Sequence, residues 1–255
     1  MKRFIILLAA ALSFPVGAAH AAADIDALWE SANTAYSNAD YTTAIRDYGV
    51  ILDEGYTSHK LYYNLGNAYF KDKQMGKAIL FYNRALLLKP SDRDTKYNLE
   101  IANGYTRDRI EPVPEFFLTR WVRSLRSVMG SNGWAAASLI LLAVMLGAAL
   151  LYLLPGKTGL RKTGFYTAIC SFALFVTALG FSIVERHEIL HSPEAIVMSS
   201  AVSVKSSPDK ASTDLFILHE GTKVRIVSSL GEWREVEVAN GNKGWIADAS
   251  IERIR

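Results

Sequence analysis

The residues His187, Glu188 and His191 have the types and spacing of a hydrolytic zinc site. On a helix, histidines four residues apart share a face and can bind one Zn²⁺, while the intervening glutamate can act as a base on metal-bound water. A site of this kind needs a third protein ligand, usually drawn from a following helix. Pro193 ends the helix here and a strand pattern begins at Ala195, so a membrane zinc protease is only a remote alternative.

No other arrangement in the sequence favours catalysis. There is neither a glycine-rich phosphate loop nor a serine nucleophile elbow, and histidines and carboxylates do not cluster elsewhere. The sole cysteine, Cys170, can form no intrachain disulfide and is expected to pack as a small side chain in an apolar run. We therefore expect a protein that is not an enzyme and that carries no metal or cofactor.

The N-terminus has the pattern of a secretory signal peptide over residues 1–21. Two basic residues precede an apolar run, and Ala19-His20-Ala21 follows as a small-x-small cleavage site. Cleavage is expected after Ala21 or Ala23.

Two later apolar runs, residues 134–154 and 165–184, are long enough to cross a bilayer. Neither contains a charged residue, and at 1.5 Å per residue each covers about 30 Å, the thickness of a hydrocarbon core. The short loop between them carries Lys157, Arg161 and Lys162, which the positive-inside rule assigns to the cytoplasm.

Residues 115–129 are predicted to form a basic amphipathic helix on the membrane surface. Arg120, Arg123 and Arg126 are spaced three apart, while large apolar side chains occupy another face. These three arginines equal the three basic residues of the loop in number, so the count of basic residues alone does not show which side is cytoplasmic. The signal peptide decides the topology, because it directs the N-terminal domain across the membrane. We expect a two-pass protein of a bacterial inner membrane with both terminal domains in the periplasm.

Charge counts argue against a nucleic-acid partner. Residues 22–110 contain 11 basic and 12 acidic side chains, and residues 185–255 contain 9 and 11. The excess of positive charge lies in residues 112–184, which contain six basic residues and one acidic residue. A nucleic-acid site would need clustered basic residues on a soluble face.

A 34-residue repeat dominates the first half of the chain. It relates the pairs Asn33/Asn67, Tyr36/Phe70, Ala44/Ala78, Ile45/Ile79 and Tyr48/Tyr82. The second copy, with Asn64-Leu65-Gly66-Asn67-Ala68-Tyr69 and later Ala78, Tyr82, Ala85 and Pro90, is similar to the tetratricopeptide (TPR) pattern of paired helices. The resemblance implies a protein-binding TPR domain over residues 24–110, with about two and a half repeats.

The concave face of such a domain is the expected partner-binding groove. Its candidate residues are Trp29, Asn33, Tyr36, Tyr63, Asn64, Asn67, Phe70 and Lys71. Some TPR domains hold a partner's carboxylate in a clamp of basic and amide residues, but here the clamp's basic positions fall on Trp29, Asp94 and Asn98. That mode is therefore excluded, and each aromatic could alternatively pack between helices.

After residue 184 the apolar pattern alternates in short strands separated by turns, which predicts a small all-β barrel over residues 192–255. Its motifs Leu218 to Val224, Gly231-Glu232-Trp233 and Gly244-Trp245-Ile246 resemble the bacterial SH3 family. Trp233 is out of phase with the core face and is either a ligand contact or a rim residue. Trp245 is expected in the core.

The whole order of modules resembles the BatE-type proteins of bacterial aerotolerance operons. The fold class is thus multi-domain, with an all-α TPR repeat, two transmembrane helices and a small all-β SH3-like barrel. The resemblance implies partners among von Willebrand A-type membrane proteins and a MoxR-type ATPase, in envelope stress or oxygen tolerance.

Two functions remain open. One is a scaffold whose paired spans tether two separate binding modules, with Ala143 and Gly147 packing the spans together or recruiting another helix. The other is a cell-wall module that binds peptidoglycan through Trp233.

Overall fold

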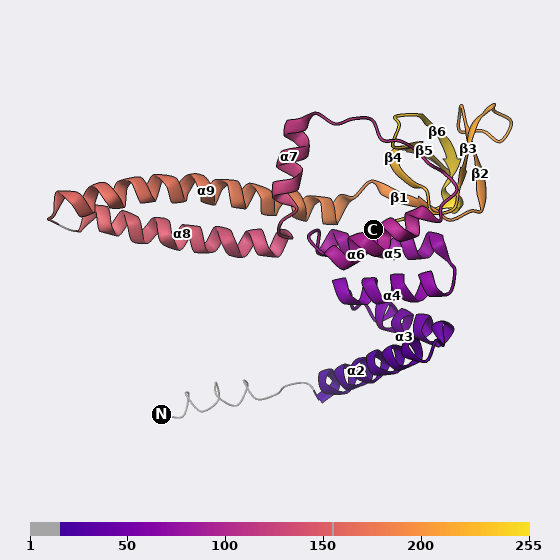
Figure 1. The fold of residues 1–255 in the computed structure, drawn as a ribbon, viewed down its shortest axis with the longest axis horizontal. Helices are drawn as coiled ribbons and strands as arrows, with labels where there is room; N and C mark the ends of the chain where they lie inside the picture. Colours follow the sequence, from indigo (N-terminus) through magenta and orange to yellow (C-terminus); the bar gives the residue numbers. More distant parts are fainter. Residues whose placement is uncertain (1–15, 155) are drawn as a thin grey trace, which may run out of the picture.

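The computed structural model describes residues 16–154 and 156–255, so most of the expected signal peptide lies outside the described part. The first half is a stack of helices in which each one packs on the next (Figure 1). These helices are α2 (Val16–Ser37), α3 (Tyr41–Asp53), α4 (His59–Lys71), α5 (Met75–Leu88) and α6 (Arg93–Gly104).

Local sequence explains where these helices begin and turn. Asp40, Ser58 and Asp92 precede α3, α4 and α6, and each side chain accepts a hydrogen bond from the backbone N–H three residues later. The turns before α3 and α5 contain Ala39 and Lys73, each with φ of 62°. These two residues are 34 positions apart, so the repeat extends to the backbone conformation of its turns.

Close packing within the second repeat depends on Gly66. A Cβ at this position would lie 2.6 Å from the ring of Tyr82, so α4 and α5 can approach this closely only around a glycine. The buried side chains of the first repeat form a core around Ala44, Tyr48 and Leu65.

Helices α8 (Ser131–Leu153) and α9 (Thr158–His191) form a long hairpin and are long and apolar enough to cross a membrane. Small residues lie between them: a Cβ on Gly164 would meet the carbonyl oxygen of Ala148 at 2.7 Å. Ala143 and Gly147 are exposed, so the expectation that they pack the two helices together is wrong. They remain available to another helix.

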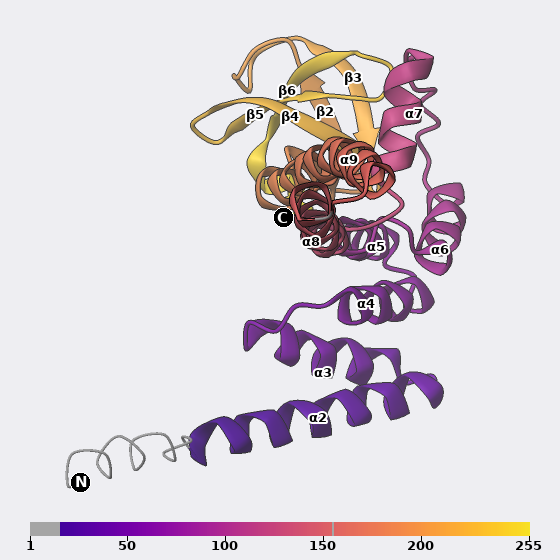
Figure 2. The same ribbon diagram turned by 90° about the vertical axis from the view of Figure 1, so that its left-hand side faces the viewer.

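Helix α7 (Phe117–Arg126) lies across the hairpin, roughly perpendicular to α8 and α9 (Figures 1 and 2). Its large apolar side chains are exposed, including Phe117 and Trp121. Arg126 fixes its end to α9, because its guanidinium lies 2.9 Å from Glu185 and 2.6 Å from Glu188.

The C-terminal region is one antiparallel sheet with the strand order β3-β2-β6-β5-β4-β1-β7. Buried residues from the first six strands form a single core, so the sheet curves around it. The strands are β1 (Glu194–Val197), β2 (Ala201–Lys205), β3 (Asp214–His219), β4 (Lys223–Leu230), β5 (Trp233–Glu237), β6 (Lys243–Ala247) and β7 (Ile251–Arg253), and a 3₁₀ turn, η1 (Asp248–Ser250), precedes β7.

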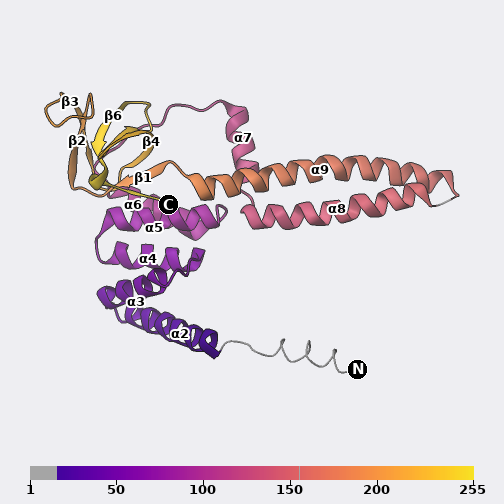
Figure 3. The same ribbon diagram turned by 180° about the vertical axis from the view of Figure 1, so that it is seen from behind.

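This sheet, together with the residues that follow it, packs directly on α5. Ile79 and Leu80 of α5 share a buried cluster with Ile196 and Ile254. The helical stack and the sheet are therefore in direct contact, in addition to being linked through α8 and α9. The stack projects sideways from the hairpin, as Figure 3 shows from behind.

Candidate functional site

The helical stack contains a cavity of about 340 Å³ on the face formed by α2, α4 and α6. This groove is lined by Tyr36, Tyr63, Asn67, Phe70, Lys71, Tyr82, Asn98 and Ile101. Five of the expected groove residues are among them. Aromatic walls with amide groups between them suit a peptide, because rings supply apolar area and amides can pair with backbone groups.

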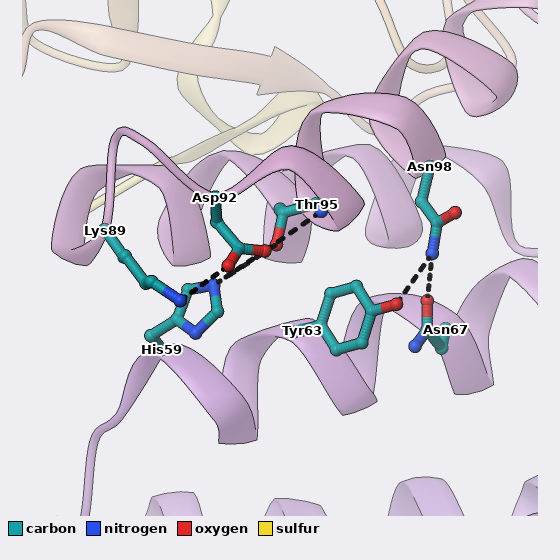
Figure 4. A network of polar contacts seen from close by, with 7 residues as sticks. All are labelled: His59, Tyr63, Asn67, Lys89, Asp92, Thr95 and Asn98. Carbon is teal, nitrogen blue, oxygen red and sulfur yellow. Dashed lines mark hydrogen bonds and ion pairs between the residues drawn. The ribbon is translucent and has the colours of Figure 1, made fainter. Parts of the chain in front are cut away.

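A hydrogen-bond network fixes the groove's polar residues. The side-chain amide of Asn98 donates to the Tyr63 hydroxyl at 3.2 Å and to the Asn67 oxygen at 2.9 Å (Figure 4). The hydroxyl of Tyr82 donates to the same Asn67 oxygen at 2.8 Å. Burial raises the pKa of Tyr82, so this phenol stays protonated and remains a donor at neutral pH.

The same network occurs one repeat earlier. Tyr48 donates to Asn33 at 2.6 Å, and Asn64 donates to Tyr48 at 3.1 Å. Trp29 packs edge-on against Tyr48 with ring centroids 5.5 Å apart. Three expected groove residues, Trp29, Asn33 and Asn64, thus hold the first repeat together and do not line the cavity.

The groove residues expected from the sequence did not include Asn98, Tyr82, Ile101 or Tyr105, although Asn98 falls on one of the clamp positions of other TPR domains. Tyr105 is 67% exposed and its ring meets Phe70 edge-on at 5.7 Å, so it extends the aromatic wall. The signal for Asn98 and Tyr82 is the 34-residue period itself, which carries the Asn64 and Tyr48 positions forward by one repeat.

A second polar group, around Asp92, lies next to the groove, because the ring of His59 stacks on that of Tyr63 with centroids 6.3 Å apart. The Asp92 carboxylate accepts from Lys89 at 2.7 Å and from Thr95, and it lies 3.3 Å from the ring of His59 (Figure 4). Burial acts to raise the Asp92 pKa, but these contacts outweigh it and the pKa is below its usual value. Burial also lowers the pKa of His59, which keeps this imidazole neutral near pH 7.

The sheet carries a second candidate surface at Trp233. Trp233 and Glu235 share a face of β5, and Glu235 pairs with Trp245 on β6, so both tryptophans lie on the face away from the core. Both are half-buried. The expectation that Trp245 is a core residue is wrong, because Gly244 and Ile246 on either side of it are buried instead.

The residues with the spacing of a zinc site, His187, Glu188 and His191, lie in the last turns of α9, which remains helical to His191. The rings of His187 and His191 stack at 4.5 Å, but Glu188 is engaged by Arg126. Among residues 16–154 and 156–255, no group of three metal-ligating side chains is found.

A cluster of contacts joins the two modules at the β3–β4 turn. Asp108, which follows α6, accepts from the His219 backbone N–H at 2.7 Å and from Thr222 at 2.6 Å, and lies 2.6 Å from the His219 ring. Gly221 has φ of 87°, and a Cβ there would meet Thr106 at 2.7 Å. A glycine is therefore needed both for the turn and for the contact.

Comparison with known protein families agrees with this architecture. Residues 59–92 match the tetratricopeptide repeat, and residues 200–252 match the bacterial SH3 domain. No curated protein matches the chain. The multi-domain fold class is confirmed: a TPR-like helical region, two helices that could cross a membrane, and an SH3-like antiparallel sheet.

Proposed function

We propose that the protein is a membrane-anchored adaptor whose TPR groove binds a segment of a partner protein. The observation that carries this proposal is the contrast between the two faces of the second repeat. The outer face of α5 is covered by the sheet, whereas the groove face keeps an aromatic and amide cavity open. The polar side chains of the groove are held in place by hydrogen bonds to one another, which favours a preformed binding site for a peptide.

In this proposal α8 and α9 cross the inner membrane and both soluble modules face the periplasm. Helix α7 lies in the membrane surface, since it is perpendicular to the hairpin and exposes a full apolar face. Helix α2 begins on the side of the stack toward which the hairpin projects, which agrees with an N-terminus delivered from the same membrane. The adaptor has no catalytic step.

The groove can be tested by site-specific photo-crosslinking in native membranes. A benzophenone amino acid at Lys71, on the groove wall, should capture a discrete partner, and the same group at Lys77 should not. Lys77 is the matched control because it is exposed on α5 and lies outside the groove. Adding Phe70→Asp should abolish the Lys71 product. Equal products from both positions would contradict the groove as the binding site.

A second candidate function is cell-wall binding through the sheet, which the outward Trp233 favours. Stacking of a sugar or peptide on a half-exposed tryptophan is a common recognition mode. The full chain in detergent should then sediment with purified peptidoglycan, and Trp233→Ala should reduce the bound fraction several-fold. Trp121→Ala on α7 is the control. A parent chain that does not sediment with the wall would exclude this function, and a Trp233→Ala variant that sediments like the parent would exclude Trp233 as the contact.

The biological setting rests on resemblance to BatE-type proteins. It supports a role beside von Willebrand A-type membrane proteins and a MoxR-type ATPase in envelope stress or oxygen tolerance. Genes for an ATPase and A-domain proteins next to this one would strengthen that setting. A membrane zinc protease through His187, Glu188 and His191 remains the remote alternative, and stoichiometric zinc together with proteolysis lost in His187→Ala would favour it.

A further inference from the structure

A second cavity lies at the junction between α9 and the sheet, away from the groove. It has a volume of about 530 Å³. Its lining consists of Leu190, His191, Ser192, Pro193, Ile226, Ser229, Arg253 and Arg255. Two guanidinium groups, one imidazole and two hydroxyls therefore surround one space, and within the described ranges 16–154 and 156–255 no carboxylate side chain lines it.

The nearby acidic residues are already paired with other cations. Glu252 binds Arg84 at 2.9 Å, and Glu194 binds Lys223 at 2.7 Å. On α9, Glu185 and Glu188 both bind Arg126. Among the described residues, neither Arg253 nor Arg255 takes part in an ion pair. The positive charge of this junction cavity is thus not neutralised by its neighbours.

The cavity lies at a defined distance, measured along the axis of α9, from the end of the apolar part of that helix. The uncharged run ends at residue 184, and the helix continues without a break to His191. Seven residues at 1.5 Å each correspond to about 10 Å. The headgroup layer is roughly 5–8 Å thick on each side of the hydrocarbon core, so lipid phosphates would lie within reach of long arginine side chains.

We propose that the junction cavity binds a phosphate group, through Arg253 and Arg255 with hydroxyl contacts from Ser192 and Ser229. Guanidinium groups bind phosphate through paired, charge-assisted hydrogen bonds, which is the chemistry this lining offers. The phosphate comes from an anionic lipid headgroup or from a soluble phosphate. Only the lipid source rests on the proposed membrane crossing.

Thermal unfolding of the full chain in non-ionic detergent tests the cavity. The three additives are inorganic phosphate, phosphatidylglycerol and phosphatidylcholine. We expect phosphatidylcholine to leave the unfolding temperature unchanged. We expect inorganic phosphate or phosphatidylglycerol to raise it by about 3–6 °C when present at roughly ten times the half-saturating concentration.

The variant Arg253→Gln/Arg255→Gln should lose this rise. Both side chains project from an exposed edge, and the backbone carbonyls that Arg84 binds are retained. The matched control Arg93→Gln/Lys210→Gln removes the same charge from exposed positions outside the cavity and outside α7, and it should keep the rise.

A rise with phosphatidylglycerol alone identifies the lipid as the source, and a rise with inorganic phosphate alone identifies a soluble source. Equal shifts in the parent and the Arg253→Gln/Arg255→Gln variant, or no shift with either phosphate compound, would overturn the proposal. Alkaline extraction of membranes tests the membrane crossing separately, so failure of one proposal does not imply failure of the other.

Discussion

Helices α3 and α5 occupy equivalent places in the two repeats, yet their outer faces differ. Arg46 of α3 is exposed, whereas Leu80, 34 residues later, is fully buried. Val50 of α3 is exposed, whereas Arg84 of α5 donates to the backbone oxygens of Arg253 and Ile254. The inner faces agree closely, with Tyr48 and Tyr82 both buried and both bonded to an asparagine.

The 34-residue repeat thus preserves the residue types on the inner faces of α3 and α5, whereas those on the outer face depend on whether another module packs there. The inner positions must recur because each helix pair packs in the same way. The outer positions are free to change, and on α5 they have become an interface with the sheet. The two modules therefore share an interface at α5.

The largest expected effect comes from giving α5 the outer face of α3. Leu80→Arg places an unpaired charge in the buried cluster with Ile196 and Ile254, which we expect to cost about 4 kcal/mol or more. The reverse change, Arg46→Leu, removes only the ion pair of an exposed guanidinium with Asp47 at 2.8 Å and should cost about 1 kcal/mol. Denaturant unfolding of the full chain in detergent measures both. If the two variants had similar stability, the outer face of α5 would be no more important for stability than the outer face of α3.

Asp108→Asn should weaken the contact between the modules by about 2–3 kcal/mol at pH 7, because the half-buried carboxylate serves three hydrogen-bonding groups. Burial raises the Asp108 pKa, but hydrogen bonds from Thr222 and His219 prevail, and the net pKa is lowered. A lowered pKa contributes stability above the usual carboxyl value of about 3.9, and the contribution is lost as pH falls through the folded-state pKa.

The stability difference between the parent and Asp108→Asn should therefore shrink as pH falls below about 4. Unfolding curves at several pH values check this, with Glu232→Gln, an exposed control on the β4–β5 turn, expected to follow the parent. A difference that stays constant down to low pH would show that the charge of Asp108 is not involved.

Arg84→Met should cost about 1–2 kcal/mol, since the long apolar stem is kept but two backbone oxygens lose their donor. The equivalent substitution on α3, Val50→Met, should change stability by about 0.5 kcal/mol or less. Limited proteolysis between residues 105 and 116 gives an independent reading, because it should accelerate only where the sheet detaches from α5. Acceleration in both variants would argue against the interface.

The smallest effects test what the repeats share. Tyr48→Phe and Tyr82→Phe each remove one buried hydroxyl bonded to an asparagine, and we expect a loss of about 1 kcal/mol in each case. Tyr97→Phe on the exposed side of α6 is the control. Thermal unfolding of the three variants compares them directly. Clearly unequal losses at Tyr48 and Tyr82 would mean that the inner faces are not equivalent.

Much of the candidate site was predictable from residue type and period. Tyr36, Tyr63, Asn67, Phe70 and Lys71 line the groove as their repeat positions indicate. Asn33 and Asn64 are expected in the groove from their repeat positions, but the hydroxyl of Tyr48 hydrogen-bonds to both. Sequence cannot show whether a polar group already has a partner 15 or 16 residues away, since that depends on how three helices meet.

The sequence by itself determined the modules: the 34-residue period, two uncharged apolar runs and the alternating strands each reflect the geometry of a single local element. Only the tertiary structure decided how those modules meet. The contact of Asp108 with His219 joins residues 111 positions apart, and the burial of Leu80 depends on Ile196 and Ile254. Such contacts arise from the fit between two distant surfaces, and no local period records that fit.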